Sequence, residues 1–332
     1  MPRPTASLLR PFTEPSRFRS LPCRQFTPRR AQAMTSQVAV AAAVAGIGAL
    51  AYLKFTSATA PPDAHSEGKS PVARGANFTT PFGFRTLKLH STEQLNHNTK
   101  RLRFELPDPT QPSGLTLTSA LLSLSFPNGG WIPVPRPYTP TNKLGKSGFV
   151  DLTVKLYPGG KASTHLHSLK AGDTCKFAPL PKQFAWTPNQ HEHVALIAGG
   201  AGITPMYQLL HGILDNPSDH TRITLVWGVN TDDDLFFHNE FTALEKKFPG
   251  RFKAEYVVSQ PTGGSSYRKG YVNKAILEEL GLRASETHNQ DIKVLVCGPP
   301  AMEKALKGGK GPFGGSGILS ELGYAKSQIV GF

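Results

Sequence analysis

The feature that most constrains the fold is a change of hydrophobic pattern in the middle of the chain. Between Phe84 and Ala185, apolar and polar residues alternate with a period of two, and clusters of proline, glycine and asparagine interrupt the alternation. This pattern is typical of strands with one buried face. One short helix is expected here, at about Ser163 to Leu169. Residues 78–187 are therefore predicted to form an antiparallel β domain, as a small closed barrel.

After Pro188 the pattern changes to near-continuous apolar runs that alternate with helical segments. The runs are HVALIA, ITLVWGV, FKAEYVVS and IKVLVC, and the helical segments are PMYQLLHGIL, FHNEFTALEKKF and Lys274–Leu280. Strands that alternate with helices indicate a doubly wound parallel sheet. We expect an α/β domain over residues 188–332. A β barrel followed by such a domain suggests an electron-transfer enzyme.

The N-terminal part of the chain has a different composition. Residues 1–37 hold seven arginines, no lysine and one acid, Glu14. This composition favours a mitochondrial targeting segment, with a disordered basic tail as the alternative. Residues 38–55 include a run of 16 residues without a charge and predict a single transmembrane helix. Residues 56–77 are expected to be a flexible linker.

Composition excludes several classes of function. The three cysteines have no CxxC spacing, which argues against a disulfide scaffold and a cysteine-rich zinc site. Two His-x-His pairs have no further ligand cluster beside them, so no metal site is expected. Much of the net charge of +14 lies in residues 1–37, and no aromatic–basic motif accompanies it. Nucleic acid is therefore not expected as a partner.

A glycine-rich loop, GGAGITP, lies between a predicted strand and a predicted helix. Gly200 and Gly202 allow a phosphate to approach the backbone, and the helix N-terminus supplies free N–H groups. Thr204 and Pro205 fall in the first helical turn, where proline is well suited. The loop predicts nucleotide binding, and an ordinary strand–helix turn is the alternative.

Two further segments follow strands of the α/β domain. Asp232, Asp233 and Asp234 lie where an acid can bind the adenosine ribose and repel a 2′-phosphate, although a solvated acidic loop explains any one of them nearly as well. Cys297, Gly298 and Pro299 lie at the carboxyl edge of the sheet, where Cys297 can contact a planar ring or be an ordinary buried thiol.

The β domain offers a second site for an anion. In the segment PRPYTP, Arg136 can pair with a diphosphate, Tyr138 offers a flat ring and Thr139 a hydrogen bond, although a proline-rich turn is an alternative. Gly160, Lys161 and Ser163 open the only helix predicted in this domain, so its backbone donors and the Ser163 hydroxyl form an anion cradle.

From Phe82 to Phe332 the chain resembles the NADH–cytochrome b5 reductases of the ferredoxin–NADP reductase superfamily. RPYTP, VKLYPGGKAS, GGAGITPM and CGPPAM occur in the order found in that family. The resemblance implies FAD in the barrel and NADH in the α/β domain. It also implies hydride transfer from NADH to FAD and single-electron transfer to two ferric cytochrome b5 molecules. The N-terminal segments are similar to those of fungal mitochondrial members, which implies a single-pass protein of the outer membrane and a processed form in the intermembrane space.

The resemblance also assigns roles to individual residues. Arg136, Tyr138 and Thr139 match the flavin motif RxYT, and Gly160 and Ser163 match GxxS. Val154, Lys155 and Tyr157 match the strand along the flavin, with Lys155 near the ring system and of catalytic interest. Gly200, Gly202 and Pro205 match the nicotinamide-domain loop, and Cys297, Gly298 and Pro299 match the segment that positions the nicotinamide.

Three single residues also match family positions. Asp234 matches the acid that selects NADH, and His97 matches a histidine of a proton relay. Phe332 matches the C-terminal phenylalanine of the family. Ala201 departs from the usual threonine and removes a hydroxyl group.

Two alternatives to this function stay open at the level of sequence. One is a reductase of the same superfamily that serves another acceptor or prefers NADPH. The other is a redox-inactive membrane adaptor that retains the fold.

Overall fold

The structure is a computed structural model that describes residues 77–78, 83–180, 184–284, 291–309 and 315–332. The predicted targeting segment, the predicted membrane helix and all but the last residue of the predicted linker lie outside these ranges. No helix within the described ranges combines the length and apolar character needed to span a bilayer.

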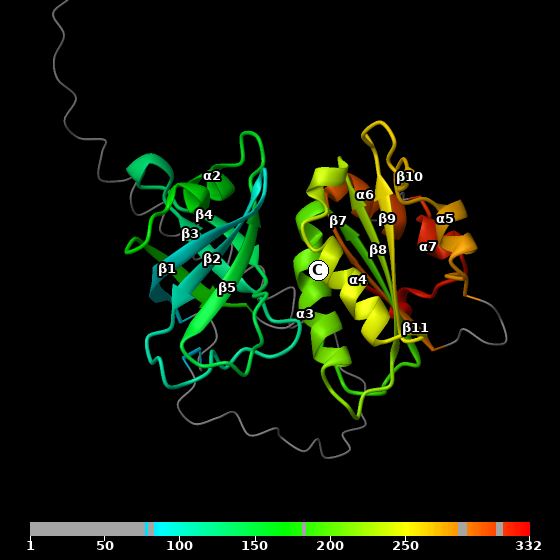
Figure 1. Ribbon diagram of the computed structural model, residues 1–332, viewed down its shortest axis with the longest axis horizontal. Helices are drawn as coiled ribbons and strands as arrows, with labels where there is room; N and C mark the ends of the chain where they lie inside the picture. The colour runs from blue at the N-terminus through cyan, green and yellow to red at the C-terminus, as the bar shows by residue number, and fades with distance from the viewer. Residues whose placement is uncertain (1–76, 79–82, 181–183, 285–290, 310–314) are drawn as a thin grey trace, which may run out of the picture. The chain divides into compact units, whose positions relative to one another are not determined.

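The first domain is built on an antiparallel sheet (Figure 1). Its strands are β1 (Arg85–Asn96), β2 (Thr99–Glu105), β3 (Leu121–Ser125), β4 (Val134–Tyr138), β5 (Phe149–Lys155) and β6 (Thr174–Pro179). They lie in the order β4-β3-β6-β1-β2-β5. Alternate residues such as Leu89, Leu102 and Phe104 are fully buried inside the curved sheet, as the period-two pattern predicts.

The sheet is a half-barrel, so the prediction of a closed barrel was wrong. Its two end strands, β4 and β5, form no ladder with each other, and one isolated bridge joins Pro140 to Leu152. Pro135 and Pro137 explain the gap, because a proline has no N–H group to donate to a second neighbouring strand. Strand β4 is thereby confined to an edge.

Helix α2 (Lys161–Ser168) is close to its predicted position and begins directly after Gly160. It packs near β3, β4, β5 and the short helix η1 (Pro127–Gly129). The N-terminus of α2 and Arg136 of the edge strand β4 line one cavity.

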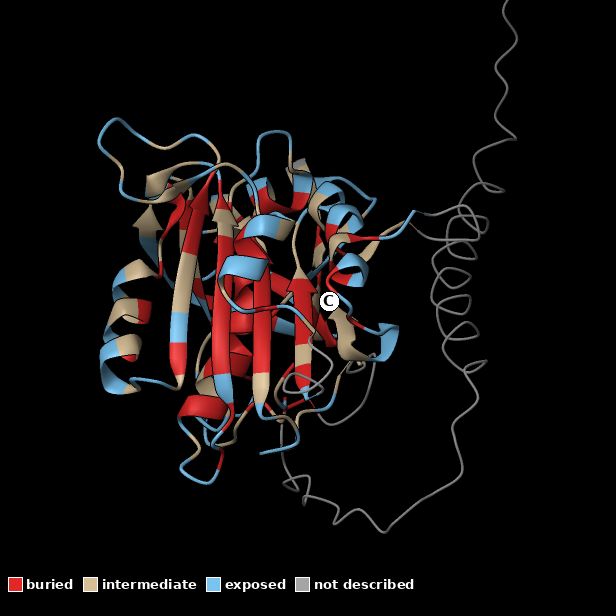
Figure 2. Cartoon of the chain, turned by 90° about the vertical axis from the view of Figure 1, so that its right-hand side faces the viewer, coloured by how far each residue is buried: buried red, intermediate tan, exposed pale blue. Residues whose placement is uncertain are grey.

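The second domain confirms the predicted parallel sheet. Its strands are β7 (His193–Gly199), β8 (Arg222–Val229), β9 (Phe252–Val258), β10 (Arg268–Lys269), β11 (Ile292–Cys297) and β12 (Ile329–Gly331), in the order β10-β9-β8-β7-β11-β12. Every neighbouring pair is parallel. The middle strands are buried along most of their length, since helices cover both faces (Figure 2).

The helices divide between the two faces of this sheet. Helices α3 (Ile203–Leu214) and α4 (His238–Lys247) share one apolar core with the sheet, around Trp227. A second apolar core, on the opposite face of the sheet, is shared by the helices α5 (Lys274–Glu279), α6 (Pro300–Lys307) and α7 (Ile318–Glu321). The strand order reverses between β7 and β11, and such a switch point opens a crevice at the carboxyl ends of the strands.

Candidate functional site

The glycine-rich loop lies at this switch point. It forms the short helix η2 (Gly200–Gly202) between β7 and α3. Gly200 has a φ of +52°, which favours glycine. A Cβ atom on Gly202 would lie 2.2 Å from the carbonyl oxygen of Cys297. The loop and the end of β11 therefore touch backbone to backbone, which only glycine permits at position 202.

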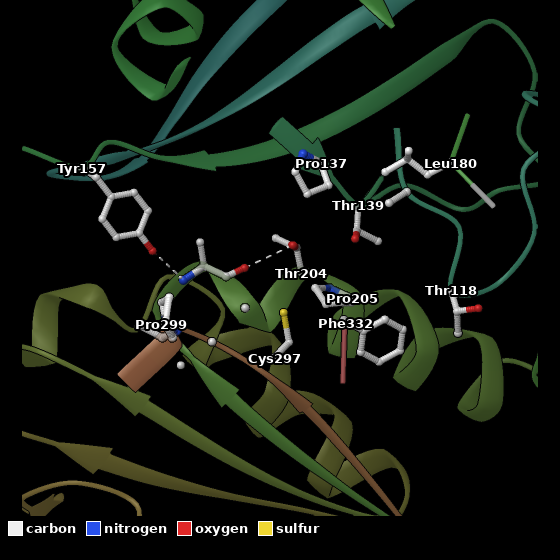
Figure 3. Close-up of a pocket in the computed structure, with 16 residues that line it drawn as sticks. Thr118, Pro137, Thr139, Tyr157, Leu180, Thr204, Pro205, Cys297, Pro299 and Phe332 are labelled. Atoms are coloured by element: carbon white, nitrogen blue, oxygen red, sulfur yellow. Dashed lines mark hydrogen bonds between the residues drawn. The ribbon is translucent and has the colours of Figure 1, made fainter. Parts of the chain in front are cut away.

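Three side chains hold this loop in place. The Trp227 indole N–H donates to the carbonyl of Gly200 at 3.0 Å. The Tyr157 hydroxyl, from the first domain, accepts the N–H of Ala201 at 3.2 Å, and the Thr204 hydroxyl donates to the carbonyl of Ala201 at 3.2 Å (Figure 3). Thr204 belongs to the predicted nucleotide-binding loop, and its hydroxyl thus has a partner within that loop.

Residues of both domains line a cavity of about 420 Å³ around the loop. The first domain contributes Thr118, Pro137, Thr139, Tyr157 and Leu180, and the second contributes Ala201, Gly202, Pro205, Cys297, Gly298, Pro299 and Phe332, among others (Figure 3). Mostly apolar walls with a few hydroxyl groups suit flat, partly polar rings. Residues of the segments RPYTP, GGAGITP and CGPP therefore meet at one cavity.

The thiol of Cys297 points into this cavity (Figure 3). Burial and then the charge of Glu303 raise the pKa of Cys297 to about 12. The thiol is therefore protonated at neutral pH, and it contributes a neutral, polarisable surface rather than a nucleophile.

A second cavity of about 350 Å³ adjoins the first and shares Tyr157, Gly199 and Pro299 with it. Its other walls include Gly200, Asn230, Lys155, Tyr271 and Met302. Tyr271 is 77% exposed and offers a flat ring at the carboxyl ends of the strands. The two cavities together form an extended site of the kind that a dinucleotide requires.

A third cavity of about 630 Å³ lies at the N-terminus of α2. It is lined by Val134, Arg136, Tyr157, Gly159, Gly160, Lys161, Ala162 and Ser163. The first N–H groups of a helix have no partner within the helix, and no side chain caps them at Gly160. The exposed Arg136 donates to the neighbouring carbonyl of Pro135, and no ion pair among the described residues includes it. A cation without a counter-ion beside free N–H groups fits the diphosphate of FAD.

Three residues assigned to the flavin have different surroundings from those expected. The side chain of Val154 is fully buried in the barrel core, so only its backbone can approach a ligand. The hydroxyl of Ser163 donates to the carbonyl of Gly160 and accepts the N–H of Tyr157, so it closes the turn instead of offering a free donor to an anion. Tyr138 packs against the barrel core and lines none of the three cavities.

The three aspartates separate into different environments. Asp232 accepts the backbone N–H of Thr262, and Asp233 is exposed. Asp234 is 3% exposed and lies 2.7 Å from the ammonium group of Lys155. For Asp234, the alternative of a solvated loop was wrong, because the carboxylate is buried between the two domains.

His97 lies beside this ion pair and lines none of the three cavities described above. Its Nε2 atom is 3.7 Å from Asp234 Oδ1 and 2.9 Å from the amide nitrogen of Asn98, which itself donates to Asp234. Its side chain is 53% exposed. The predicted proton-relay role of His97 stays a prediction.

Sequence reasoning missed Tyr271, Asn98 and Asn230. Tyr271 lies in the loop before α5, where no periodicity marks it, and Asn230 directly follows β8 as the first residue of the polar run NTDDD. Asn98 occupies the turn between β1 and β2, and its contact with Asp234 joins residues 136 positions apart. None of these positions carried a motif signal.

Comparisons with known proteins divide the chain in the same way. Residues 86–182 match the oxidoreductase FAD-binding domain, and residues 196–308 match the oxidoreductase NAD-binding domain. These ranges agree with the half-barrel that carries Arg136 and with the parallel sheet that carries the glycine-rich loop.

Relatives match over most of the chain. A protein of Botryotinia fuckeliana named NADH-cytochrome b5 reductase 2 is 46% identical over 257 residues, which cover 75% of this chain and 72% of that protein. A Pyricularia oryzae protein of the same name is 41% identical over 324 residues, which cover 94% and 96%. The cytochrome b5 reductase domain of Ulva prolifera nitrate reductase superposes with a TM-score of 0.66 at 29% identity, covering 77% of this chain and 99% of that one.

Proposed function

This chain belongs to the family of NADH–cytochrome b5 reductases, and we propose that it reduces cytochrome b5 with NADH while attached to a membrane. It is an oxidoreductase with an FAD-binding and an NAD-binding domain. The observation that carries the proposal is the 420 Å³ cavity, where Thr139 and Tyr157 of the first domain face Ala201 and Cys297 of the second. A hydride donor and a hydride acceptor must meet in such a shared space.

When bound, FAD supplies the redox chemistry, since it accepts an electron pair and releases electrons singly. The residues of the chain supply placement. Arg136 and the N–H groups at the start of α2 hold a diphosphate in the first domain. The Gly199–Gly202 loop and the N-terminus of α3 hold the phosphates of the dinucleotide.

The walls of the shared cavity protect the hydride transfer from water and from nearby charge. Pro137, Leu180 and Phe332 are apolar and limit the access of water. The neutral thiol of Cys297 places no charge beside the rings. The hydrogen bond from the Ala201 N–H to the Tyr157 hydroxyl joins the nucleotide loop to the flavin domain. It therefore fixes the position of one cofactor site relative to the other.

The proposed reaction predicts a two-stage change of colour. Full-length protein loaded with FAD is expected to lose its yellow absorbance rapidly with NADH in the absence of oxygen, and more slowly with NADPH. Ferric cytochrome b5 is then expected to restore the yellow colour while its haem is reduced, two haem proteins per flavin. Absorbance spectra recorded during both additions measure this.

Each alternative function has its own result in this experiment. Protein that cannot take up FAD would contradict the enzymatic function and favour the membrane adaptor. Protein that bleaches with NADH but does not reduce cytochrome b5 would be a reductase for another acceptor. Faster bleaching with NADPH would contradict the nucleotide preference.

The membrane part of the proposal depends on residues 38–55, which lie outside the described residues, and on the arginine-rich residues 1–37. We expect a single-pass attachment to the mitochondrial outer membrane, with a processed form in the intermembrane space. In cell fractions, the full chain should sediment with mitochondrial membranes and resist extraction at high pH, and a variant lacking residues 38–55 should be released. Equal extraction of both proteins would contradict the anchor. Unchanged mitochondrial recovery without residues 1–37 would contradict their targeting role.

A further inference from the structure

Gln208 joins helix α3 of the second domain to two segments of the first. It lies in the second turn of α3 and is 5% exposed. Its amide Nε2 donates to the carbonyl of Pro140 at 3.1 Å and to the carbonyl of Ser119 at 3.4 Å. The helix can come this close because Gly212, one turn later, has no side chain, and a Cβ atom there would meet the side chain of Leu117. One buried amide therefore holds two separate segments across the domain boundary.

These two segments form a wall between two cavities. Residues from both of them line the 420 Å³ cavity, namely Thr118, Ala120 and Thr139 (Figure 3). Their neighbours in the chain line a different, polar cavity of about 730 Å³, namely Leu117 and Thr141. Gln208 lines this polar cavity too, and it bonds to carbonyls within the wall. The position of the wall therefore depends on Gln208.

The first of the two segments contains a strained residue. Thr118 has a φ of +67°, a conformation that β-branched residues rarely adopt. Such a conformation persists only where the surrounding structure fixes it. The Thr118 hydroxyl donates to the carbonyl of Phe184, and Gln208 bonds to the next residue, Ser119. The place of Thr118 in the cavity wall thus depends on both contacts.

The amide of Gln208 is needed for its donor and not for its oxygen. Its Oε1 atom is buried and has no hydrogen-bond partner among the residues that the structure describes. A buried oxygen without a partner is destabilising, and an apolar side chain of similar length would avoid this. The N–H groups that reach Ser119 and Pro140 are therefore what a glutamine contributes at this position.

We propose that Gln208 is a positioning residue for hydride transfer, which holds the segments 118–120 and 139–140 of the flavin domain against the nucleotide helix. The glycine-rich loop leads directly into this helix, so the amide fixes the wall of the shared cavity relative to that loop. Gln208 does not line the shared cavity, and it acts through the segments that it holds. The inference rests on the proposed function, because it takes this cavity as the place of hydride transfer.

The test is the substitution Gln208→Met in the full-length, FAD-loaded protein. Methionine is of similar length and has no donor, so both hydrogen bonds to the wall are lost. Leu210→Val is the matched control. Two positions along a helix place its side chain on the opposite face, where it is buried in the core of the second domain. This control removes a buried methylene from the same helix and keeps the Gln208 amide.

The first readout separates the rate of reduction from the binding of NADH. Rapid-mixing absorbance over a range of NADH concentrations gives a limiting rate and a dissociation constant. We expect Gln208→Met to lower the limiting rate about 10-fold and to change the dissociation constant less than about twofold, because a displaced wall misplaces the rings without removing contacts to the nucleotide. The fall is limited because the bond between Ala201 and Tyr157 remains. Leu210→Val should change neither quantity.

The second readout is hydrogen exchange, which requires no reaction. The backbone N–H groups of Ser119 and Thr141 are hydrogen-bonded within the flavin domain. In Gln208→Met, these two amides should exchange about 10-fold faster, while the amides in the middle of the sheets exchange as before. In Leu210→Val, they should exchange as in the unmodified protein.

Other outcomes would overturn the inference. Equal falls in the limiting rate of both variants would mean that Gln208 only stabilises the helix. Faster exchange with an unchanged limiting rate would mean that the wall does not govern the transfer, and unchanged exchange would mean that Gln208 does not hold the wall. If Gln208→Met does not fold, Gln208→Asn replaces it with the same expected results, because its amide is one methylene shorter. Failure of the unmodified protein to be reduced by NADH would contradict the proposed function, and the exchange measurement would still test Gln208.

Discussion

Replacing Gly202 by alanine is expected to slow the reduction of bound FAD by NADH about 100-fold or more. The added Cβ would lie 2.2 Å from the carbonyl oxygen and 2.6 Å from the carbonyl carbon of Cys297. Both are backbone atoms, so the loop or the end of β11 must shift by about 1 Å, and a misplacement of that size can cost about 100-fold in rate. Stopped-flow absorbance at several NADH concentrations measures the limiting rate.

The backbone at Gly202 isolates this steric effect. Its φ of −62° and ψ of −4° are ordinary for alanine, so the substitution introduces no conformational strain. Gly263→Ala is the control, because a Cβ there has no atom within 4 Å. We expect the Gly202 variant to keep its FAD and to lose about 1–3 kcal/mol of unfolding free energy through overpacking. An unchanged limiting rate would show that the two segments need not touch for transfer.

The architecture was predictable because its signals are local. Period-two alternation marked the strands of the first domain, and apolar runs between helical segments marked the parallel sheet of the second. The loop Gly199–Gly202 and the segment Cys297–Pro299 were recognisable for the same reason. Each is a short motif whose neighbours in the chain already define a strand end.

The sequence did not reveal distant pairings or the directions of side chains. Closure of the barrel depends on whether β4 can pair with β5, and Pro135 and Pro137 prevent a ladder. Val154 and Lys155 were both assigned to the flavin strand, yet successive residues of a strand point to opposite faces, and Val154 points into the core. The pairing of Lys155 with Asp234 joins residues far apart in the chain, so no local pattern could reveal it.

Ala201 shows how the structure reinterprets a departure from the family pattern. The resemblance implies that the missing hydroxyl would face the flavin, which predicts less efficient hydride transfer. In the structure, the backbone N–H and carbonyl of Ala201 are bonded to Tyr157 and Thr204. The loop is therefore fixed by its backbone, and its position does not depend on the residue 201 side chain.

Replacing Arg136 by alanine is expected to weaken FAD binding about 100-fold and leave the unliganded protein as stable as before. The guanidinium lines the 630 Å³ cavity, and its Nη1 donates to the carbonyl of Pro135 at 2.7 Å. A hydrogen bond to a charged group contributes about 1.5–3 kcal/mol, and an arginine can make two to a diphosphate. The purified variant should be pale, and FAD titration followed by flavin fluorescence measures the dissociation constant.

Two further variants separate charge from geometry at this site. Arg136→Lys keeps the charge but loses the planar fork, so it should bind FAD with intermediate affinity. Arg222→Ala removes an exposed arginine at the start of β8, outside this cavity, and should bind FAD normally. Excess FAD should restore the NADH-dependent bleaching of Arg136→Ala, because the second domain is unchanged. If Arg136→Ala stays fully yellow after dialysis, the FAD diphosphate does not lie between β4 and α2, and the assignment of this cavity is wrong.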